Sequence, residues 1–146
     1  MKSEKSLGEA LWNQINAVEF GEFMKARGLN QNLKIVIAIF YNGQRMYHVG
    51  LPGTELLNDD WVMRKVNTVE LTKQSSLSLR VKVDALGVHE DELGFQSGHL
   101  AVCGGGYPLY TNGELVGIAV VSGLPHVEDH EFIVKALEEF RDEQSW

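Results

Sequence analysis

The stretch Val116–Phe132, "VGIAVVSGLPHVEDHEF", contains the change of pattern that decides the fold. Its first half is an apolar, β-branched run typical of a buried strand, and the Ser-Gly and Leu-Pro pairs then interrupt it. A helix is expected to begin near Pro125 or His126, because apolar residues recur at helical spacing further along: Ile133, Ala136, Leu137 and Phe140. The stretch therefore predicts a strand, a tight turn and a helix that packs on the sheet.

Two Asn-Gly pairs, at Asn42-Gly43 and Asn112-Gly113, predict tight hairpins. The first joins an apolar run, 33–41, to an alternating run, 44–49, and the second precedes the buried strand at 115–121. A further strand is expected at 98–103, leading into three glycines and a short strand at 107–110. Pro108 cannot donate to a ladder, which favours an edge position for its strand. Together these runs predict an antiparallel meander.

Side chains alternate along a strand, so the second arm of the first hairpin has two faces. Met46, His48 and Gly50 should share one face, and the other should hold Arg45, Tyr47 and Val49. His48 is then either a hydrogen-bonded core residue or part of a pocket.

Three further segments have the patterns of regular structure. Ser6-x-x-Glu9 has the form of a capping box and predicts a helix of about five turns that stops near Gly28. The large apolar residues of this helix are not confined to one face, which suggests that a second face contacts another subunit. Asn58 is a plausible N-cap for a helix that runs to about Lys73. Ser76–Val83 alternates cleanly, so its period alone predicts a strand.

Composition narrows the class of protein. A chain of 146 residues is about one domain, and its 44% apolar and 23% charged residues are typical of globular proteins. A net charge of −7 with dispersed Lys and Arg argues against nucleic acid as a partner. No apolar run approaches the roughly 20 residues of a membrane span, and the N-terminus has no secretory signal, so we expect a cytoplasmic protein without a membrane partner. Cys103, the single cysteine, cannot form an internal disulfide.

The chain resembles the haem-degrading-domain superfamily, the HbpS, GlcG and PduO C-terminal-like proteins, and within it a small cytoplasmic branch without settled chemistry. Five runs in a shared order carry the resemblance: "NGQRMYHVGLPGT" (42–54), "NDDWVMRKVNTV" (58–69), "SS" (75–76), "GGGYPL" (104–109) and "VGIAVVSGLPHVEDHEF" (116–132). The resemblance implies one domain over 1–146 with a profilin-like or PAS-like α/β (α+β) fold, a five-stranded antiparallel sheet flanked by helices. It also implies a homo-oligomer, and a helix where Ser76–Val83 alternates.

The resemblance suggests haem as a cofactor, because some superfamily members look like haem binders that degrade haem or sense iron and redox state. A histidine often precedes the glycines in the family pattern, whereas this chain has Cys103 there. Any ligand role at that position is therefore in question, although a thiolate could still coordinate haem iron. Fold similarity alone is weak support for an activity.

His126 and His130 are four residues apart, so a helix would place both imidazoles on one face, at a spacing suited to a shared metal ion. The sequence HVEDH matches neither common metalloprotease pattern. Capping and packing explain the same residues without a metal. A third interpretation is an anion or ligand pocket, in which Ser122 and Gly123 precede the unpaired N–H groups of the helix and Gly105 approaches from a neighbouring strand. Three glycines also fit a bulge or a tight turn.

A second cluster lies on the helix that is expected after Asn58. Asn58, Trp61 and Lys65 share one face, and Arg64 adjoins Trp61, which suits an anionic ligand or a subunit contact. An exposed charged face is the alternative. His99, at the start of the strand expected at 98–103, has no defined role from its sequence context and stands with His48 and His130 as a candidate ligand-binding residue.

Two classes of function follow. The first is an oligomeric HbpS-like protein that binds haem or another small anionic ligand, with oxidative turnover as an extension. The second is a non-enzymatic homo-oligomeric adaptor for a protein partner, favoured because no coherent acid, base and nucleophile set is visible. A metal hydrolase built on the two histidines ranks third. The sequence does not decide whether the protein is an enzyme.

Overall fold

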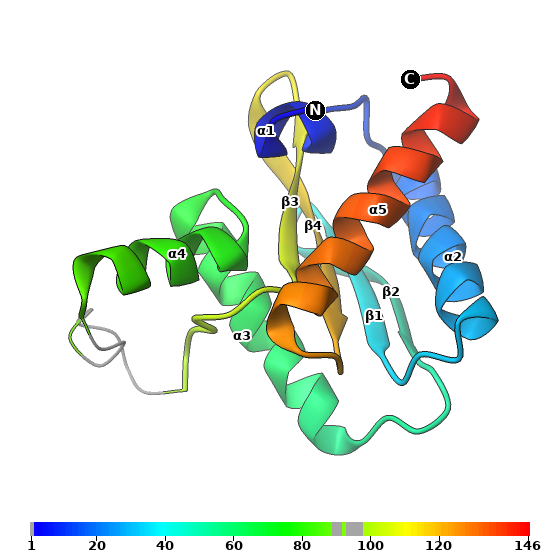
Figure 1. Cartoon of the computed structure of the whole chain (residues 1–146). Helices are drawn as coiled ribbons and strands as arrows, with labels where there is room; N and C mark the ends of the chain where they lie inside the picture. Colours follow the sequence, from blue (N-terminus) through cyan, green and yellow to red (C-terminus); the bar gives the residue numbers. More distant parts are fainter. Residues whose placement is uncertain (1, 89–91, 93–97) are drawn as a thin grey trace.

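A four-stranded antiparallel sheet forms the centre of the computed structural model, which describes residues 2–88, 92 and 98–146 (Figure 1). The strand order within these residues is β2-β1-β4-β3. The strands are β1 (Val36–Tyr41), β2 (Gln44–Gly50), β3 (Gly106–Thr111) and β4 (Glu114–Ser122).

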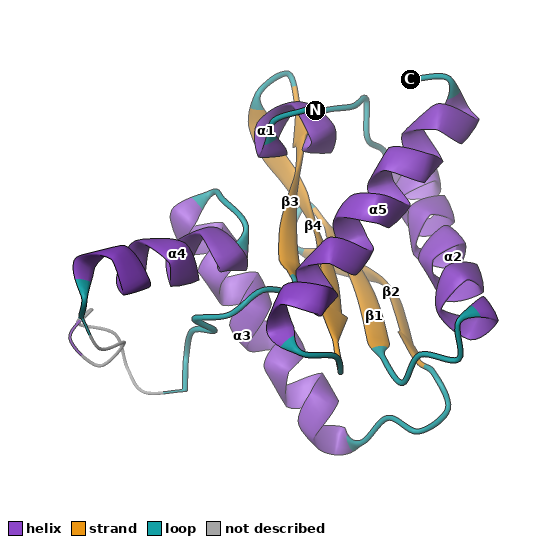
Figure 2. Cartoon of the chain, viewed as in Figure 1, coloured by secondary structure: helices purple, strands orange, loops and turns teal. Residues whose placement is uncertain are grey.

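Helices cover both faces of the sheet, which gives an α+β fold in three layers (Figure 2). Helices α2 and α5 pack on one face and α3 packs on the other, with α4 beside α3 and the short α1 against β3. The helices are α1 (Glu4–Gly8), α2 (Gln14–Asn30), α3 (Leu56–Thr72), α4 (Ser76–Leu86) and α5 (His126–Gln144).

Strand β1 shows why the central strands are apolar on both sides. Ile37 and Ile39 lie in the cluster beneath α2 and α5, whereas Val36 and Ala38 lie in the cluster beneath α3. Because a strand points successive side chains to opposite faces, a strand between two helical layers needs a continuous apolar run. The predicted core face of α5 is confirmed, since all four of its predicted residues are buried: Ile133, Ala136, Leu137 and Phe140.

Both predicted hairpins are confirmed. Asn42 and Gly43 have φ angles of 49° and 79°, the left-handed pair that matches the twist of a two-residue hairpin. Pro108 lies on β3, an edge strand, as predicted. The predicted faces of β2 are wrong at one residue. A bulge leaves Met46 unpaired between Arg45 and Tyr47, so Arg45 stacks over Phe40 on the α3 side while Tyr47 faces α2.

The fifth strand expected at 98–103 is not formed, so the sheet of the described residues has four strands where five were expected. Side chains of α3 satisfy the backbone of this segment in place of a strand. Thr68 Oγ1 accepts from Ala101 N and donates to Ala101 O, each at 2.9 Å, and Arg64 Nε donates to the carbonyl of Leu100. The segment is thereby held as an irregular loop over α3.

The single long N-terminal helix is also a wrong prediction, because the chain forms two helices. Asn13 caps α2, exchanging hydrogen bonds of 2.8 Å with Asn16, and α2 continues through Gly28 to Asn30. Glu9 does not close a capping box with Ser6. Its carboxylate accepts instead from Asn112 N and Gly113 N in the second hairpin.

The remaining helix predictions agree with the structure, apart from one cap. Residues 76–83 lie in α4, as the family resemblance implied, with the Ser75 hydroxyl accepting from Ser78 N. Helix α3 ends at Thr72, but its N-cap is Glu55, and Asn58 is the third helical residue. Among the described helices, none is both long enough and apolar enough to cross a bilayer.

Candidate functional site

A cavity of about 320 Å³ lies where the start of α3, the loop before β3 and the turn between β4 and α5 meet. It joins the "NDDWVMRK", "CGGG" and "SGLPH" runs, which are far apart in sequence. The lining residues come from all three segments: Leu57, Asn58, Trp61, Lys65, Cys103, Ser122, Gly123, Leu124, His126 and Asp129.

A buried ion pair forms one wall of this cavity. Lys65 and Asp129 have side chains only 3% and 2% exposed, with Nζ 3.1 Å from Oδ2. Lys65 Nζ also donates to the carbonyl of Val121 at 2.9 Å, and Asp129 Oδ1 accepts from Leu124 N at 2.9 Å. Burial raises the pKa of the Asp129 carboxyl, while Lys65 and backbone N–H groups act to lower it. The pair ties α3 to α5 through the end of β4.

The glycines before β3 allow this pair and the start of α5 to approach the sheet. Gly105 has φ of 126°, and a methyl group on it would lie 2.4 Å from Lys65 Nζ. A methyl group on Gly104 would lie 2.4 Å from the carbonyl oxygen of His126. Close packing against Lys65 and α5 therefore explains both glycines, since no larger residue fits.

His126 sits in the first turn of α5, where its ring contacts this glycine loop. Nδ1 accepts a hydrogen bond of 3.1 Å from the backbone N–H of Gly104. A backbone N–H can only donate, so Nδ1 must be unprotonated. The neutral ring therefore carries its proton on Nε2.

The cavity also has an apolar and aromatic side. Leu57 and Trp61 line it from α3, and the Arg64 guanidinium stacks 3.8 Å from the centre of the Trp61 ring. Cys103 is half-buried and also lines the cavity, and burial raises the pKa of its thiol, against the opposing effect of Lys65. Burial thus favours the neutral thiol over the thiolate.

The structure brings together most of the residues predicted for a site. Trp61, Lys65, Ser122, Gly123 and His126 line the cavity. Gly105 packs against Lys65, which lines the cavity, and Arg64 stacks on Trp61, which also lines it.

Three predicted histidines lie outside this cavity. His48 Nε2 is 2.9 Å from Asp59 Oδ1 on the surface, and His99 is exposed, with its carbonyl accepting from Asn67. His130 lies against Tyr107, its Nδ1 buried without a described partner, and burial lowers the pKa of its imidazole. Within the described residues no group of three or more His, Cys, Asp or Glu could hold a metal ion.

Sequence reasoning missed the role of Asp129, because an acidic residue in the first turn of a helix is explained by the helix dipole alone. One signal was present: Asp129 precedes Ile133 by four residues and so falls in the apolar stripe of α5. A carboxylate in such a stripe needs a buried partner, and Lys65 provides it.

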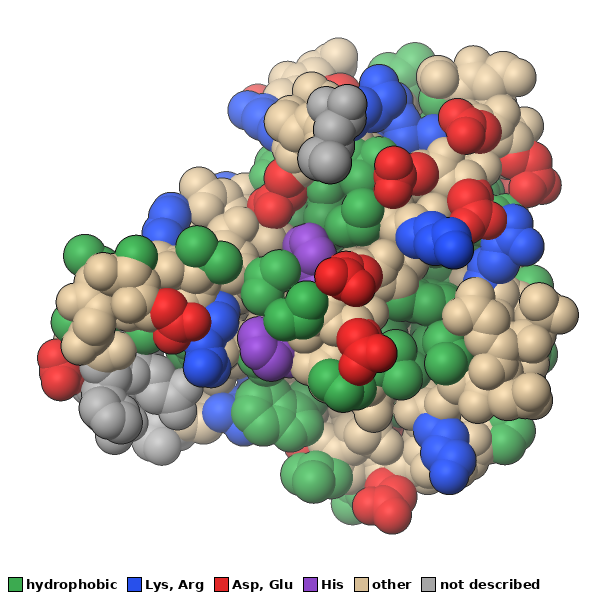
Figure 3. Space-filling view, in the orientation of Figure 1, with side chains coloured by type: hydrophobic (Ala, Val, Ile, Leu, Met, Phe, Trp, Pro, Cys, Tyr) green, Lys and Arg blue, Asp and Glu red, His purple; other side chains and the backbone are tan. Residues whose placement is uncertain are grey.

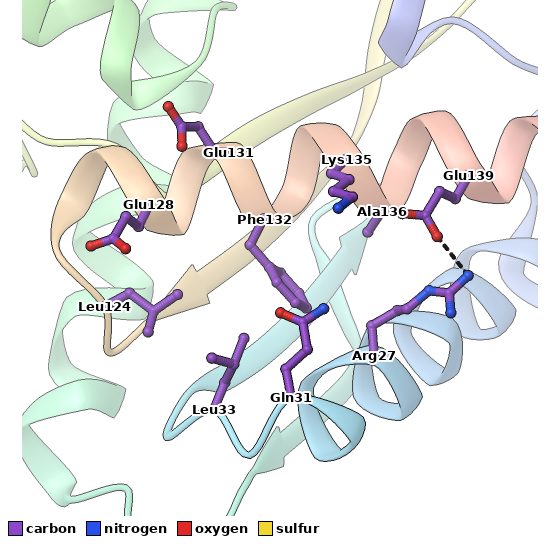
Figure 4. A pocket seen from close by; sticks show the side chains of 10 residues that line it. All are labelled: Arg27, Gln31, Leu33, Leu124, Glu128, Glu131, Phe132, Lys135, Ala136 and Glu139. Carbon is purple, nitrogen blue, oxygen red and sulfur yellow. Dashed lines mark ion pairs between the residues drawn. The ribbon is translucent and has the colours of Figure 1, made fainter.

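A second hollow, of about 250 Å³, lies between the end of α2 and the outer side of α5 (Figure 4). Leu33 and Phe132 form its apolar part, and Arg27 pairs with Glu139 across it. Acidic side chains also gather over α5 in Figure 3. Only Leu124 is shared with the first cavity.

Comparisons with known proteins bear on this geometry. A family model described as "Haem degrading protein HbpS-like" matches residues 13–138. A UPF0303 protein of Yersinia enterocolitica is 34% identical over 134 residues, which cover 88% of this chain and 78% of the relative.

Two solved structures share the fold. The Ybr137w protein has a TM-score of 0.87 at 22% identity, over 98% of this chain and 86% of its own. A PduOC:Heme complex has a TM-score of 0.71 at 19% identity, over 88% of this chain and 94% of its own.

Proposed function

Because this chain belongs to the HbpS-like family of haem-degrading proteins, we propose that it is a ligand-binding protein whose site is the cavity beside Lys65 and Asp129. The ligand is haem or another small anionic molecule. Haem enters as a candidate because one neighbour in fold is described as a heme complex.

One observation carries the proposal: a buried polar pair, a buried serine and an aromatic side chain meet in one cavity. Lys65, Asp129 and Ser122 are each at most 3% exposed, and Trp61 lines the same space. Small-molecule sites combine apolar walls with a few converging polar groups in this way, in cavities of roughly 300–1,000 Å³. This cavity, at about 320 Å³, lies at the lower end of that range.

Thermal unfolding in the presence of hemin or benzoate tests the proposal. A ligand at about 100 times its Kd adds about 2.7 kcal/mol to stability, which corresponds to about 5–10 °C for a chain of this size. At least one of the two probes should raise Tm, and Trp61→Ala should abolish that rise. Met63→Ala is the control, since Met63 is exposed on the same helix and does not line the cavity. If neither probe raises Tm, the proposal is wrong.

A homo-oligomeric adaptor for a protein partner is the second candidate function. Leu11 and Ile15 favour it, because they are 74% and 75% exposed beside the start of α2, where contacts between subunits would bury them. Light scattering of the full chain should then show one closed assembly, which Leu11→Ser together with Ile15→Ser breaks apart. A monomer at all concentrations would rule this function out. If Trp61→Ala or Arg64→Ala splits the assembly, these residues serve an interface and not the cavity.

A further inference from the structure

Three polar side chains on the cavity wall share one property: Asn58, His126 and Asp129 each already accept a hydrogen bond from within the protein. Asn58 Oδ1 accepts from the backbone N–H of Glu55 at 2.8 Å. Because that N–H can only donate, the orientation of the Asn58 amide is fixed, and its NH₂ group is what remains for a bound molecule.

His126 follows the same rule. Its Nδ1 accepts from Gly104 N, so the ring's other nitrogen carries the proton in the neutral form. The polar group that His126 can present to a ligand is therefore a donor. An imidazole can coordinate a metal only through a nitrogen lone pair, which this tautomer keeps on the atom bonded to Gly104.

One N–H group of Lys65 in the ion pair remains available as a donor. Lys65 uses two of its three N–H groups on Val121 O and Asp129 Oδ2, while the Asp129 oxygens accept from Lys65 and from Leu124 N. Its positive charge is balanced by Asp129 at 3.1 Å. A ligand carrying one negative charge suits this balanced wall better than a dianion such as phosphate.

We infer that the cavity takes a small monocarboxylate with a short apolar body, held by donors from Asn58, His126 and Lys65 beside the Trp61 ring. This inference rests on the proposed function and narrows its ligand. Carboxylate oxygens are acceptors only, so they complement a wall of donors.

Haem does not fit the same residues. While the Gly104 bond holds, His126 presents a proton and not a lone pair, and burial raises the pKa of the Cys103 thiol, which disfavours the thiolate that iron would need. The cavity volume of about 320 Å³ also suits a small molecule better than a macrocycle.

Calorimetric titration of the full chain with benzoate and with its neutral analogue benzamide tests the inference. Benzamide replaces one acceptor oxygen by a donor, so it should bind about tenfold to a hundredfold more weakly, the range for one hydrogen bond to a charged group. His126→Phe should weaken benzoate binding by a similar factor. His99→Phe, the same change at an exposed histidine outside the cavity, should leave it unchanged. Equal binding of the two probes would overturn the inference.

Nitrogen NMR of the wild-type imidazoles gives a test that needs no variant to fold. The His126 ring should show Nε2 protonated and Nδ1 accepting; the opposite tautomer would overturn the inference. A hemin Soret shift that His126→Phe abolishes would also overturn it, yet would leave the proposed function standing. Failure of both hemin and benzoate to bind would remove the inference and the proposed function together.

Discussion

Replacing Lys65 by Met should strongly destabilise the fold, because it leaves a carboxylate buried without its counter-charge. Asp129 is 2% exposed and would keep only backbone N–H partners, such as that of Leu124. Removing one partner of a buried ion pair costs about 3–5 kcal/mol. For a chain of this length that corresponds to a fall in Tm of about 6–20 °C.

The loss of stability in Lys65→Met should be larger at high pH than at low pH. Without Lys65 the pKa of Asp129, already raised by burial from its ordinary 3.8, rises further in the folded state. The folded state then binds a proton more readily than the unfolded state, so stability falls as pH rises from about 4 towards the folded-state pKa. Lys65→Met should therefore be closer to wild type at pH 5 than at pH 8.

Urea unfolding of three variants measures the effect. Lys65→Met with Asp129→Asn should recover part of the loss, because Asn keeps a carbonyl oxygen for Leu124 N and removes the charge. Lys25→Met, the same change in an exposed pair with Glu22, should cost less than about 1 kcal/mol. A double variant as unstable as the single one, or a Lys65→Met loss below about 1 kcal/mol, would refute the reasoning.

Three further predictions concern the elements around the site. Gly105→Ala should lower the free energy of unfolding, measured with urea, by about 1–3 kcal/mol more than Gly43→Ala does. Both glycines have positive φ, but only at Gly105 would a methyl group lie 2.4 Å from another atom. Equal losses in the two variants would contradict the packing explanation. Asn13→Ala should remove the N-cap of α2 and lower the free energy of unfolding by about 0.5–2 kcal/mol. Gln14→Ala, which removes no cap, should leave the free energy of unfolding nearly unchanged in the same assay. Burial lowers the pKa of His130 below 6.5, so on acidification the unfolded state takes up this proton before the folded state does, and stability should fall as pH drops below about 6.5. The urea midpoints of wild type and His130→Gln should therefore converge as the pH is lowered. Parallel pH profiles of the two proteins would contradict this prediction.

Local signals were sufficient for much of the fold. Asn42-Gly43 specifies its hairpin because few other pairs accept two left-handed residues, and the apolar stripe of α5 identifies its buried face. Period alone was misleading at 76–83. There Leu79 and Val83 also repeat at helical spacing, and the Ser75 cap with Gly87 as the stop favours the observed helix α4.

The two wrong elements have different causes: a distant contact at 98–103, and a local helix cap at Asn13. The strand expected at 98–103 would need a partner in the sheet, but Thr68 and Arg64 satisfy its backbone from α3 instead. The chain breaks between α1 and α2 because Asn13 forms a capping box there. The bonds from Thr68 and Arg64 are long-range, and such substitutes for backbone pairing leave no periodic trace in the sequence.

The cavity was only partly predictable for a related reason. Helical spacing places Asn58, Trp61 and Lys65 on one face, and that prediction is confirmed by their shared position on the cavity wall. Which atoms remain available to a ligand depends on the bonds at Glu55 and Gly104, which only the folded geometry reveals.

Binding of a monocarboxylate in the cavity beside Lys65 and Asp129 can be observed directly by titrating ¹⁵N-labelled protein with benzoate and following its backbone amides. If the cavity binds benzoate, saturable shifts with one Kd are expected at the two loops that bound the cavity, 103–105 and 122–124. Shifts confined to the groove between α2 and α5, or no saturable shifts at all, would contradict binding in the cavity.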